Sequence, residues 1–339
     1  MSRGVTGLDL DAFGRWAADA LPDVGPPLEA TLIAGGKSNL TFAVTDGLRE
    51  WIVRRPPLGH VLETAHDMAR EYRVIAALQD TAVPVPHAYA LCSDAGVLGA
   101  PFYVMERCPG TPFRHASELE PRGPARTRAI AEQLVDTLVA LHSVDPVSVS
   151  LGDLGRPAGF LQRQVERWRT QLAASYSRDL PLADELYQEL SARVPTEGAG
   201  AVIHGDYRLD NVLVDDRDRL TAVLDWEMAT LGDPLTDLAL MLVYFRLGAN
   251  GVAGLSDVST APGFLDEWGV VERYSRGSGR DVSAIGFYLG LAAFKLAAIL
   301  EGIHFRHLAG QTVGAGFDGI GEAIEPLLHA GVAAVRDSA

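Results

Sequence analysis

Short runs of apolar and β-branched residues alternate with turn residues over the first hundred positions. This pattern is typical of β-strands. The pair Asp46-Gly47, between the second and third runs, predicts a hairpin turn. Between the third and fourth runs, the segment 64–79 places apolar side chains at helical spacing. The predicted order is therefore three strands, one helix and two strands, with the strands at 31–34, 40–44, 51–53, 87–91 and 102–105.

Helical periodicity dominates from position 126 onward. Over 126–142, apolar residues such as Ile130, Leu134 and Leu138 recur every four residues, which predicts an amphipathic helix. Because the change from strands to helices falls near 106–110, we expect a β-rich nucleotide-binding lobe over 1–107 and a helical lobe with the catalytic loop and acceptor site over 108–339. Further helices are predicted at 160–175, 182–193, 235–244, 263–276, 282–308 and 319–335.

The most informative segment, 201–245, contains a predicted β-hairpin within the helical half. Apolar residues at 212–214 and 220–224 flank a polar turn. Antiparallel pairing around Asp218 would place Asn211 roughly opposite Asp225, with Asp206 one short loop away. Carboxylate and amide oxygens gathered in this way suit a hard cation such as Mg²⁺ and leave one carboxylate to hold a nucleophile.

Charge and composition exclude several classes of function. The chain has 339 residues, 47% of them hydrophobic, which is enough for one large or two moderate domains with their own cores. Its net charge of −15 argues against a nucleic-acid partner, because no basic surplus is present to neutralise phosphates. Cys92 and Cys108 lack metal-ligand spacing and are expected to be free thiols. His142, at the end of a predicted helix, is expected to cap that helix rather than bind a ligand.

Features of targeting and of other enzyme classes are missing from the sequence. The first eleven residues carry two aspartates and no apolar core, unlike a signal peptide. The long apolar segment 286–305 is interrupted by Lys295 and Glu301, so we expect a buried helix and no membrane partner. We therefore expect a cytoplasmic protein. The motifs GxxxxGK[ST] and GxSxG do not occur, which argues against a P-loop and an α/β-hydrolase nucleophile.

Two spacings in the segment 201–245 match those of a phosphoryl-transfer site. Asp206 and Asn211 are five positions apart, like the catalytic-loop Asp and the metal-binding Asn of protein kinases, and Asp225 follows across the hairpin. The surrounding sequence resembles the aminoglycoside phosphotransferase (phosphotransferase enzyme) family in HGDYRLDNVL at 204–213, LDWE at 224–227, GDP at 232–234 and Asp237. This resemblance implies an α+β, two-lobed protein-kinase-like fold with a small β-rich N-lobe and a larger, mostly helical C-lobe.

The resemblance also implies a role for each motif residue. Asp206 would orient the acceptor hydroxyl and accept its proton, whereas Asn211 and Asp225 would hold Mg²⁺ on the nucleotide phosphates. Asp233 and Asp237 would brace the loop and cap the helix that follows it.

The small lobe offers candidate contacts for the nucleotide. A kinase-like site needs a cation on the third strand and a carboxylate on the helix, and alternation from a buried Ile52 selects Arg54 with Glu71 as its partner. Arg54 departs from the more common Lys, and its fork could bind phosphates bidentately. The loop 35–39 could cradle phosphates with its amides, and the resemblance implies that the 102–108 segment binds adenine. The candidate nucleotide contacts are Gly35, Gly36, Ser38, Asn39, Arg54, Glu71, Glu106, Cys108, Leu213 and Leu224.

The sequence thus predicts a Mg²⁺-dependent phosphotransferase that moves the γ-phosphoryl group of ATP to a hydroxyl of a small molecule, with GTP as an open alternative donor. The segment FYLGLAAFKLAAILEG at 287–302 resembles the branch of the family associated with acyl-CoA dehydrogenase domains, which implies an acceptor such as a hydroxyacyl thioester. An amino alcohol is a second candidate acceptor. A catalytically silent nucleotide-binding protein and a metal-dependent hydrolase are the competing hypotheses, and both a monomer and a homodimer are compatible with the sequence.

Overall fold

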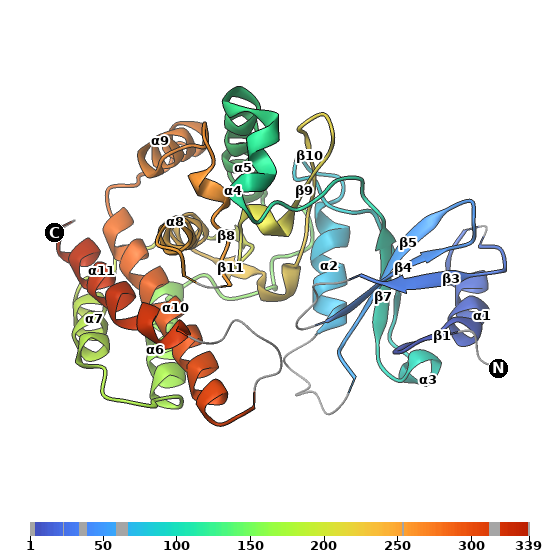
Figure 1. The fold of residues 1–339 in the computed structure, drawn as a ribbon, viewed down its shortest axis with the longest axis horizontal. Helices are drawn as coiled ribbons and strands as arrows, with labels where there is room; N and C mark the ends of the chain where they lie inside the picture. Colours follow the sequence, from blue (N-terminus) through green and yellow to red (C-terminus); the bar gives the residue numbers. More distant parts are fainter. Residues whose placement is uncertain are drawn as a thin grey trace. The chain divides into compact units, whose positions relative to one another are not determined.

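The computed structural model describes residues 4–22, 24–33, 39–58, 67–252, 254–311 and 319–337. The chain divides into two compact units (Figure 1). The first unit contains Met1–Gly110 and Thr221–Ala229, and the second contains Thr111–Leu220 and Thr230–Ala339. Their positions relative to one another are not determined. The first unit therefore includes a short segment that a simple division at residue 107 assigns to the helical lobe.

A five-stranded antiparallel sheet with the order β3-β4-β5-β7-β6 forms the frame of the first unit. Thr45 pairs with Glu50 across the Asp46-Gly47 turn, so the predicted hairpin is confirmed. The Asp46 side chain closes this turn by accepting the amide of Leu48 at 2.9 Å. The strands are β3 Glu29–Leu32, β4 Leu40–Thr45, β5 Glu50–Arg55, β6 Ala88–Cys92 and β7 Phe102–Glu106.

Different helices pack on the two faces of this sheet. Phe102 of β7 shares an apolar core with Phe13 of α1 (Leu10–Ala20). Tyr103, the next residue, points to the opposite face, where its ring centroid lies 6.1 Å from that of Tyr72 on α2 (Met68–Leu78). Alternation of side chains along a strand explains this division. Three short elements complete the unit: β1 Gly4–Val5, β2 Leu8–Asp9 and α3 Ala95–Leu98.

Four helices begin later than the sequence pattern suggests: α2, α9 (Glu267–Ser278), α10 (Ile285–Leu308, predicted from 282) and α11 (Ile324–Asp337, predicted from 319), and N-cap residues account for the first two. α2 starts at Met68 because Asp67 has an extended backbone and its side chain accepts the amide of Arg70, as an N-cap does; residues 64–66 of the predicted helix lie outside the described part. α9 starts four residues after the predicted 263, because Asp266 caps it in the same way. In both cases the apolar periodicity extends to positions before an N-cap residue, whose side chain fixes where the helix begins.

The second unit is a helical assembly around α10 (Ile285–Leu308), which packs against α6, α7, α8 and α11. Of the described helices, α10 alone is long and apolar enough to cross a membrane by length and composition, and 83% of its most apolar window is buried inside the protein. Burial in this unit accounts for its apolar composition. The other helices are α4 Ala116–Leu119, α5 Pro124–Ser143, α6 Phe160–Ala173, α7 Pro181–Ala192, α8 Leu235–Ala249 and α11 Ile324–Asp337.

Two short strand pairs lie within the segment 201–245, one inside the other along the chain. β8 (Ala201–Ile203) pairs antiparallel with β11 (Thr230–Gly232) in the second unit. β9 (Val212–Val214) and β10 (Leu220–Val223) form the two-stranded sheet that the sequence predicts as a hairpin. The chain passes from the second unit to the first within β10, after Leu220.

Candidate active site

Arg54 contacts the two acidic residues of the first unit that the sequence places in the site. Its Nε lies 3.1 Å from Glu71 Oε2 on α2, and its Nη2 donates to Asp225 Oδ1 at 2.5 Å. Only 13% of the Arg54 side chain and 1% of the Glu71 side chain are exposed. The predicted pairing of Arg54 with Glu71 is therefore present, as an ion pair in which Nε is not aligned for a hydrogen bond.

Burial and neighbouring charges shift the pKa values of Glu71 and Arg54 in this cluster. Burial raises the pKa of Glu71 to about 7; Arg54 opposes this shift, and the carboxylates of Asp225 and Glu227 add to it. Burial alone would lower the pKa of Arg54, but its acidic neighbours outweigh burial and raise it. The Arg54 guanidinium thus contacts two acidic side chains, and Glu227 adds a further negative group that acts on Glu71.

Asp225 stands at a sharp turn directly after β10. Its backbone adopts the left-handed conformation (φ 66°, ψ 60°), which Asp tolerates better than most residues. Trp226, the next residue, is fully buried and donates its Nε1 to the Val223 carbonyl at 3.0 Å. This anchor fixes the turn while 30% of the Asp225 side chain stays exposed. Asn39 Nδ2 donates to Glu227 Oε2 at 3.4 Å, so a carboxylate that the sequence analysis did not single out joins the cluster.

The other candidate nucleotide contacts fall into two groups. Three lie outside the described residues: Gly35, Gly36 and Ser38. Four are partly exposed, with the last in the second unit: Glu106, Cys108, Leu224 and Leu213. Their contacts with a nucleotide stay predictions.

In the second unit, β8 leads directly into the loop that carries Asp206. Asn211 Nδ2 donates to the backbone oxygen of Asp206 at 2.8 Å and to its Oδ2 at 3.0 Å. These bonds use the amide nitrogen and leave Asn211 Oδ1 as the atom suited to a hard cation. The structure therefore brings Asp206 and Asn211 together, whereas Asp225, predicted opposite Asn211, belongs to the first unit.

Asp237 fastens this loop to the start of α8. Its Oδ2 accepts the amide of His204 at 2.6 Å, and its Oδ1 accepts the amide of Gly205 at 2.8 Å, which is the bracing contact implied by the resemblance. The ring of His142 joins the same network, with Nε2 3.3 Å from Asp237 Oδ2 and Nδ1 2.7 Å from the Tyr274 hydroxyl. The expectation that His142 caps a helix is wrong: it is buried, and burial lowers its pKa.

Asp233, just before α8, also contacts the start of that helix. Its Oδ1 accepts the amide of Leu235 at 3.1 Å at the start of α8, and its Oδ2 accepts the hydroxyl of Tyr288 at 2.9 Å. The role of this residue is thus structural, since both carboxylate oxygens bind groups of the protein.

Three residues missed by the sequence analysis surround Asp206. Arg208 Nε lies 3.4 Å from Asp206 Oδ2, and its Nη1 lies 2.9 Å from Asp210 Oδ2. The guanidinium of Arg208 is 4.7 Å from the ring centroid of Tyr244 on α8. Burial raises the pKa of Tyr244 well above its usual value, and the negative charge of Asp206 adds to this shift. Arg208 and Asp210 lie within the motif, but only the fold shows that Tyr244 joins them.

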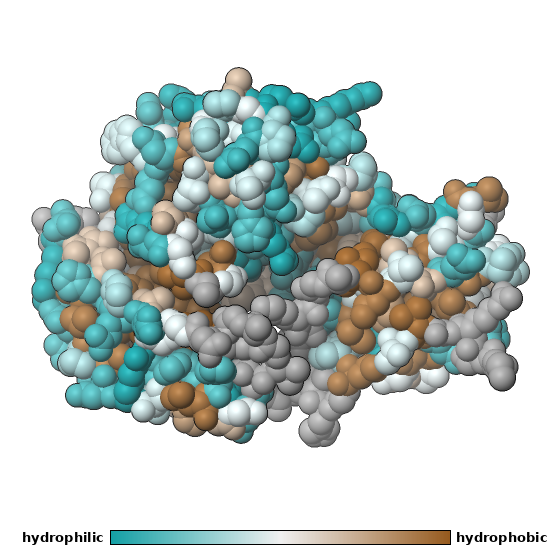
Figure 2. Space-filling model, viewed as in Figure 1, coloured by the Kyte–Doolittle hydropathy of each residue, from teal (hydrophilic) through white to brown (hydrophobic). Residues whose placement is uncertain are grey.

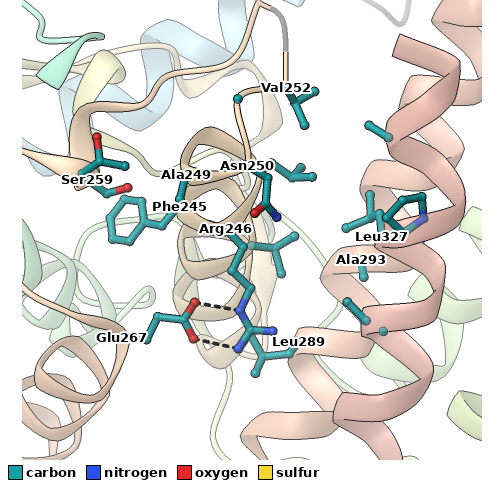
Figure 3. A pocket seen from close by; sticks show the side chains of 18 of the residues that line it. Phe245, Arg246, Ala249, Asn250, Val252, Ser259, Glu267, Leu289, Ala293 and Leu327 are labelled. Carbon is teal, nitrogen blue, oxygen red and sulfur yellow. Dashed lines mark hydrogen bonds and ion pairs between the residues drawn. The ribbon is translucent and has the colours of Figure 1, made fainter. Parts of the chain in front are cut away.

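A cavity of about 860 Å³ opens beside α8 in the second unit (Figure 3). Apolar residues of α8, α10 and α11 form much of its wall, among them Phe245, Leu289 and Leu327. Arg246 crosses the wall and binds Glu267 through two hydrogen bonds of 2.7 Å each. Figure 2 likewise shows apolar residues gathered where this face of the second unit is hollowed. A volume of this size suits a small organic molecule with a largely apolar body.

Comparison with known proteins identifies the family. The model of the phosphotransferase enzyme family matches residues 29–271. The chain belongs to this family. Acyl-CoA dehydrogenase family member 11 of Gallus gallus is 36% identical to this phosphotransferase-family chain over 307 residues, which cover 88% of this chain and 39% of that protein. The chain spans about a quarter to two fifths of the length of the acyl-CoA dehydrogenase family members that it matches, and the predicted likeness to that branch is confirmed.

Solved structures of phosphotransferases have the same fold. A Ralstonia eutropha protein assigned as an aminoglycoside phosphotransferase matches with a TM-score of 0.85 and 33% identity, over 97% of this chain and 98% of that chain. A second match is aminoglycoside phosphotransferase APH(4)-Ia, solved as a variant with AMP-PNP and hygromycin B. It has a TM-score of 0.61 over 95% of this chain and 98% of that chain. At 15% identity, this match shows a likeness of fold alone. The predicted kinase-like α+β fold is confirmed.

Proposed function

We propose that this member of the phosphotransferase family transfers the γ-phosphoryl group of ATP to a hydroxyl of a small molecule. The observation that carries the proposal is the Asp206–Asn211 pair, in which Asn211 Nδ2 holds the Asp206 carboxylate at 3.0 Å on a loop fastened by Asp237. A carboxylate fixed in this way can orient an acceptor hydroxyl and take up its proton as the phosphorus–oxygen bond forms. The other contributions of the protein to phosphoryl transfer are the positioning of the two substrates and the neutralisation of charge on the phosphates.

The residues present fit Mg²⁺ as the metal. Asn211 keeps its amide oxygen available, and Asp225 has one carboxylate oxygen on Arg54 and a second one not used in that contact. Oxygen donors of these two types match the preference of Mg²⁺, which usually completes its shell with water and substrate phosphates. When bound, the metal would neutralise charge on the phosphates, while Arg54 and the loop 35–39 would contact them.

The acceptor is the least constrained part of the proposal. The relatives named as acyl-CoA dehydrogenases and the apolar wall of the cavity beside α8 both support a hydroxyacyl thioester as the acceptor. An amino alcohol is the second candidate. An aminoglycoside is less favoured, because a polycation would need more carboxylates than the apolar wall supplies.

Calorimetry with AMP-PNP, with and without Mg²⁺, tests the donor side. We expect Mg²⁺-dependent binding that Asp225→Ala removes, and unchanged binding in that variant would place the metal elsewhere. The acceptor side needs a screen for ADP release over hydroxyacyl thioesters, amino alcohols and aminoglycosides. The proposal fails if nucleotide binds but no hydroxyl compound is phosphorylated and ATP is not hydrolysed even slowly.

A nucleotide-binding protein without transfer activity is the alternative. The contact of 2.5 Å between Arg54 Nη2 and Asp225 Oδ1 favours it, because a guanidinium at this oxygen competes with a metal ion. ATP hydrolysis by the wild type that vanishes in Asp206→Asn would exclude this alternative. Hydrolysis that is absent in the wild type but appears in Arg54→Lys would support it.

A further inference from the structure

Lys295 reaches from α10 to the loop that carries Asp206. Its Nζ donates to the carbonyl oxygen of Gly205 at 2.7 Å, and the two residues are ninety positions apart in the sequence. Only two of the 29 basic residues of the chain are lysines, and all the others are arginines. The ammonium of Lys is a compact point charge, whereas the guanidinium of Arg is a broad planar fork.

The bonded carbonyl belongs to the peptide unit that joins Gly205 to Asp206. On the other side of this unit, the amide of Asp206 donates to His204 Nδ1 at 3.2 Å. Gly205 has φ +85°, a conformation that residues with a side chain rarely adopt. Because both polar groups of a rigid peptide plane are held, the position of the Asp206 Cα, from which the side chain starts, is fixed as well.

Lys295 is buried beside two acidic residues and an aromatic ring. Burial lowers the pKa of the Lys295 ammonium, and the negative charges of Asp206 and Asp237 offset part of this shift. The face of Trp168 on α6 also lies close, with its ring centroid 5.6 Å from Nζ. The ammonium is therefore placed between a main-chain carbonyl, an aromatic ring and two carboxylates that belong to the catalytic loop or support it.

We propose that Lys295 is a positioning residue for phosphoryl transfer, which fixes the Gly205–Asp206 peptide and so aims the Asp206 carboxylate at the acceptor hydroxyl. This inference rests on the proposed function, because it assigns Asp206 the role of the base. It makes a distinct claim about the chain, since nothing in the family motif at 204–213 includes a residue of α10. Loss of the ammonium should affect the chemical step and leave nucleotide binding intact.

A matched control is available six residues, or about 1.7 turns, further along the same helix. Glu301 is fully buried on α10 and accepts the amide of Ser177 at 3.0 Å, away from the catalytic loop. Glu301→Gln therefore perturbs a buried polar contact of α10 without touching Gly205. A purely structural role for Lys295 predicts equal effects of Lys295→Met and Glu301→Gln on turnover.

The experiment compares wild type, Lys295→Met, Lys295→Arg and Glu301→Gln by steady-state kinetics and by hydrogen exchange of the peptide spanning 203–208. We expect Lys295→Met to lower kcat by about 100-fold, the typical cost of misplacing a reacting group by about 1 Å, with the KM for ATP within about twofold of wild type. Exchange at 203–208 should rise in Lys295→Met only, and Lys295→Arg should recover part of kcat.

Three results would overturn the proposal: a kcat within threefold of wild type in Lys295→Met, an equal loss in Glu301→Gln, or unchanged exchange at 203–208 in Lys295→Met. The exchange measurement needs no substrate. It therefore tests the positioning role of Lys295 even if no wild-type turnover is found. Absence of wild-type turnover would count against the proposed function alone.

Discussion

Replacing Glu71 by Gln tests the electrostatics of the Arg54 cluster. Glu71 is 1% exposed, and burial raises its pKa from 4.5 to about 7. Between these two values the folded state holds a proton that the unfolded state has released. The stability conferred by this proton is fully present below about pH 4.5 and is lost as the pH rises through about 7.

The size of the effect follows from the displacement of the pKa. At about 1.4 kcal/mol per pH unit, the change from 4.5 to about 7 corresponds to about 3 kcal/mol of unfolding free energy. Gln at this position cannot titrate. The unfolding free energy of Glu71→Gln, relative to wild type, should therefore rise by about 3 kcal/mol between about pH 4.5 and about pH 8.

Urea unfolding at several pH values measures this difference, with tryptophan fluorescence as the signal because Trp51 and Trp226 are buried in the first unit. Glu50→Gln is the control, since Glu50 lies on the same strand as Arg54 and 53% of its side chain is exposed. This control should show little dependence on pH. A difference for Glu71→Gln that stays flat, or that falls as the pH rises, would refute the reasoning.

Two further predictions concern the second unit. The Asp237 carboxylate accepts two backbone amides, including that of Gly205, and Asp237→Asn keeps only one oxygen to accept them. We therefore expect a loss of about 1–3 kcal/mol of stability and a lower kcat. Wild-type values in thermal unfolding and kinetics would contradict this. Gly248→Ala would place a methyl group 1.9 Å from the Ser256 carbonyl oxygen. Thermal unfolding of this variant should show a loss of about 1–3 kcal/mol of stability. The control Gly198→Ala, where no atom lies within 4 Å of the added methyl group, should show no such loss.

Elements with strong periodicity could be predicted from the sequence, and short or capped elements could not. The β4–β5 hairpin and the long helix α5 follow from a turn signal and from apolar spacing. α1 was missed because it precedes the first strong strand signal, although Asp9 caps it by accepting the amides of Asp11 and Ala12. Local chemistry at helix ends is therefore a signal that periodicity alone overlooks.

The candidate site shows the same division. The pairing of Arg54 with Glu71 could be predicted from strand alternation and helix position, because both depend on local geometry. The contacts of Tyr244 and Lys295 with the catalytic loop join elements far apart in the chain, and no spacing rule connects them. Likewise, the burial of His142 against Asp237 depends on how α5 packs, which the helix pattern alone leaves open.

The most direct test of the central claim is the turnover of Asp206→Asn with Mg²⁺-ATP, measured beside its affinity for Mg²⁺-AMP-PNP. Asp216→Asn, in the exposed turn after β9, is the control. Loss of a general base predicts a kcat lower by about 10²–10⁴-fold in Asp206→Asn with nucleotide affinity unchanged, and wild-type behaviour in the control. Turnover retained in Asp206→Asn, or affinity lost in parallel with turnover, would contradict the account.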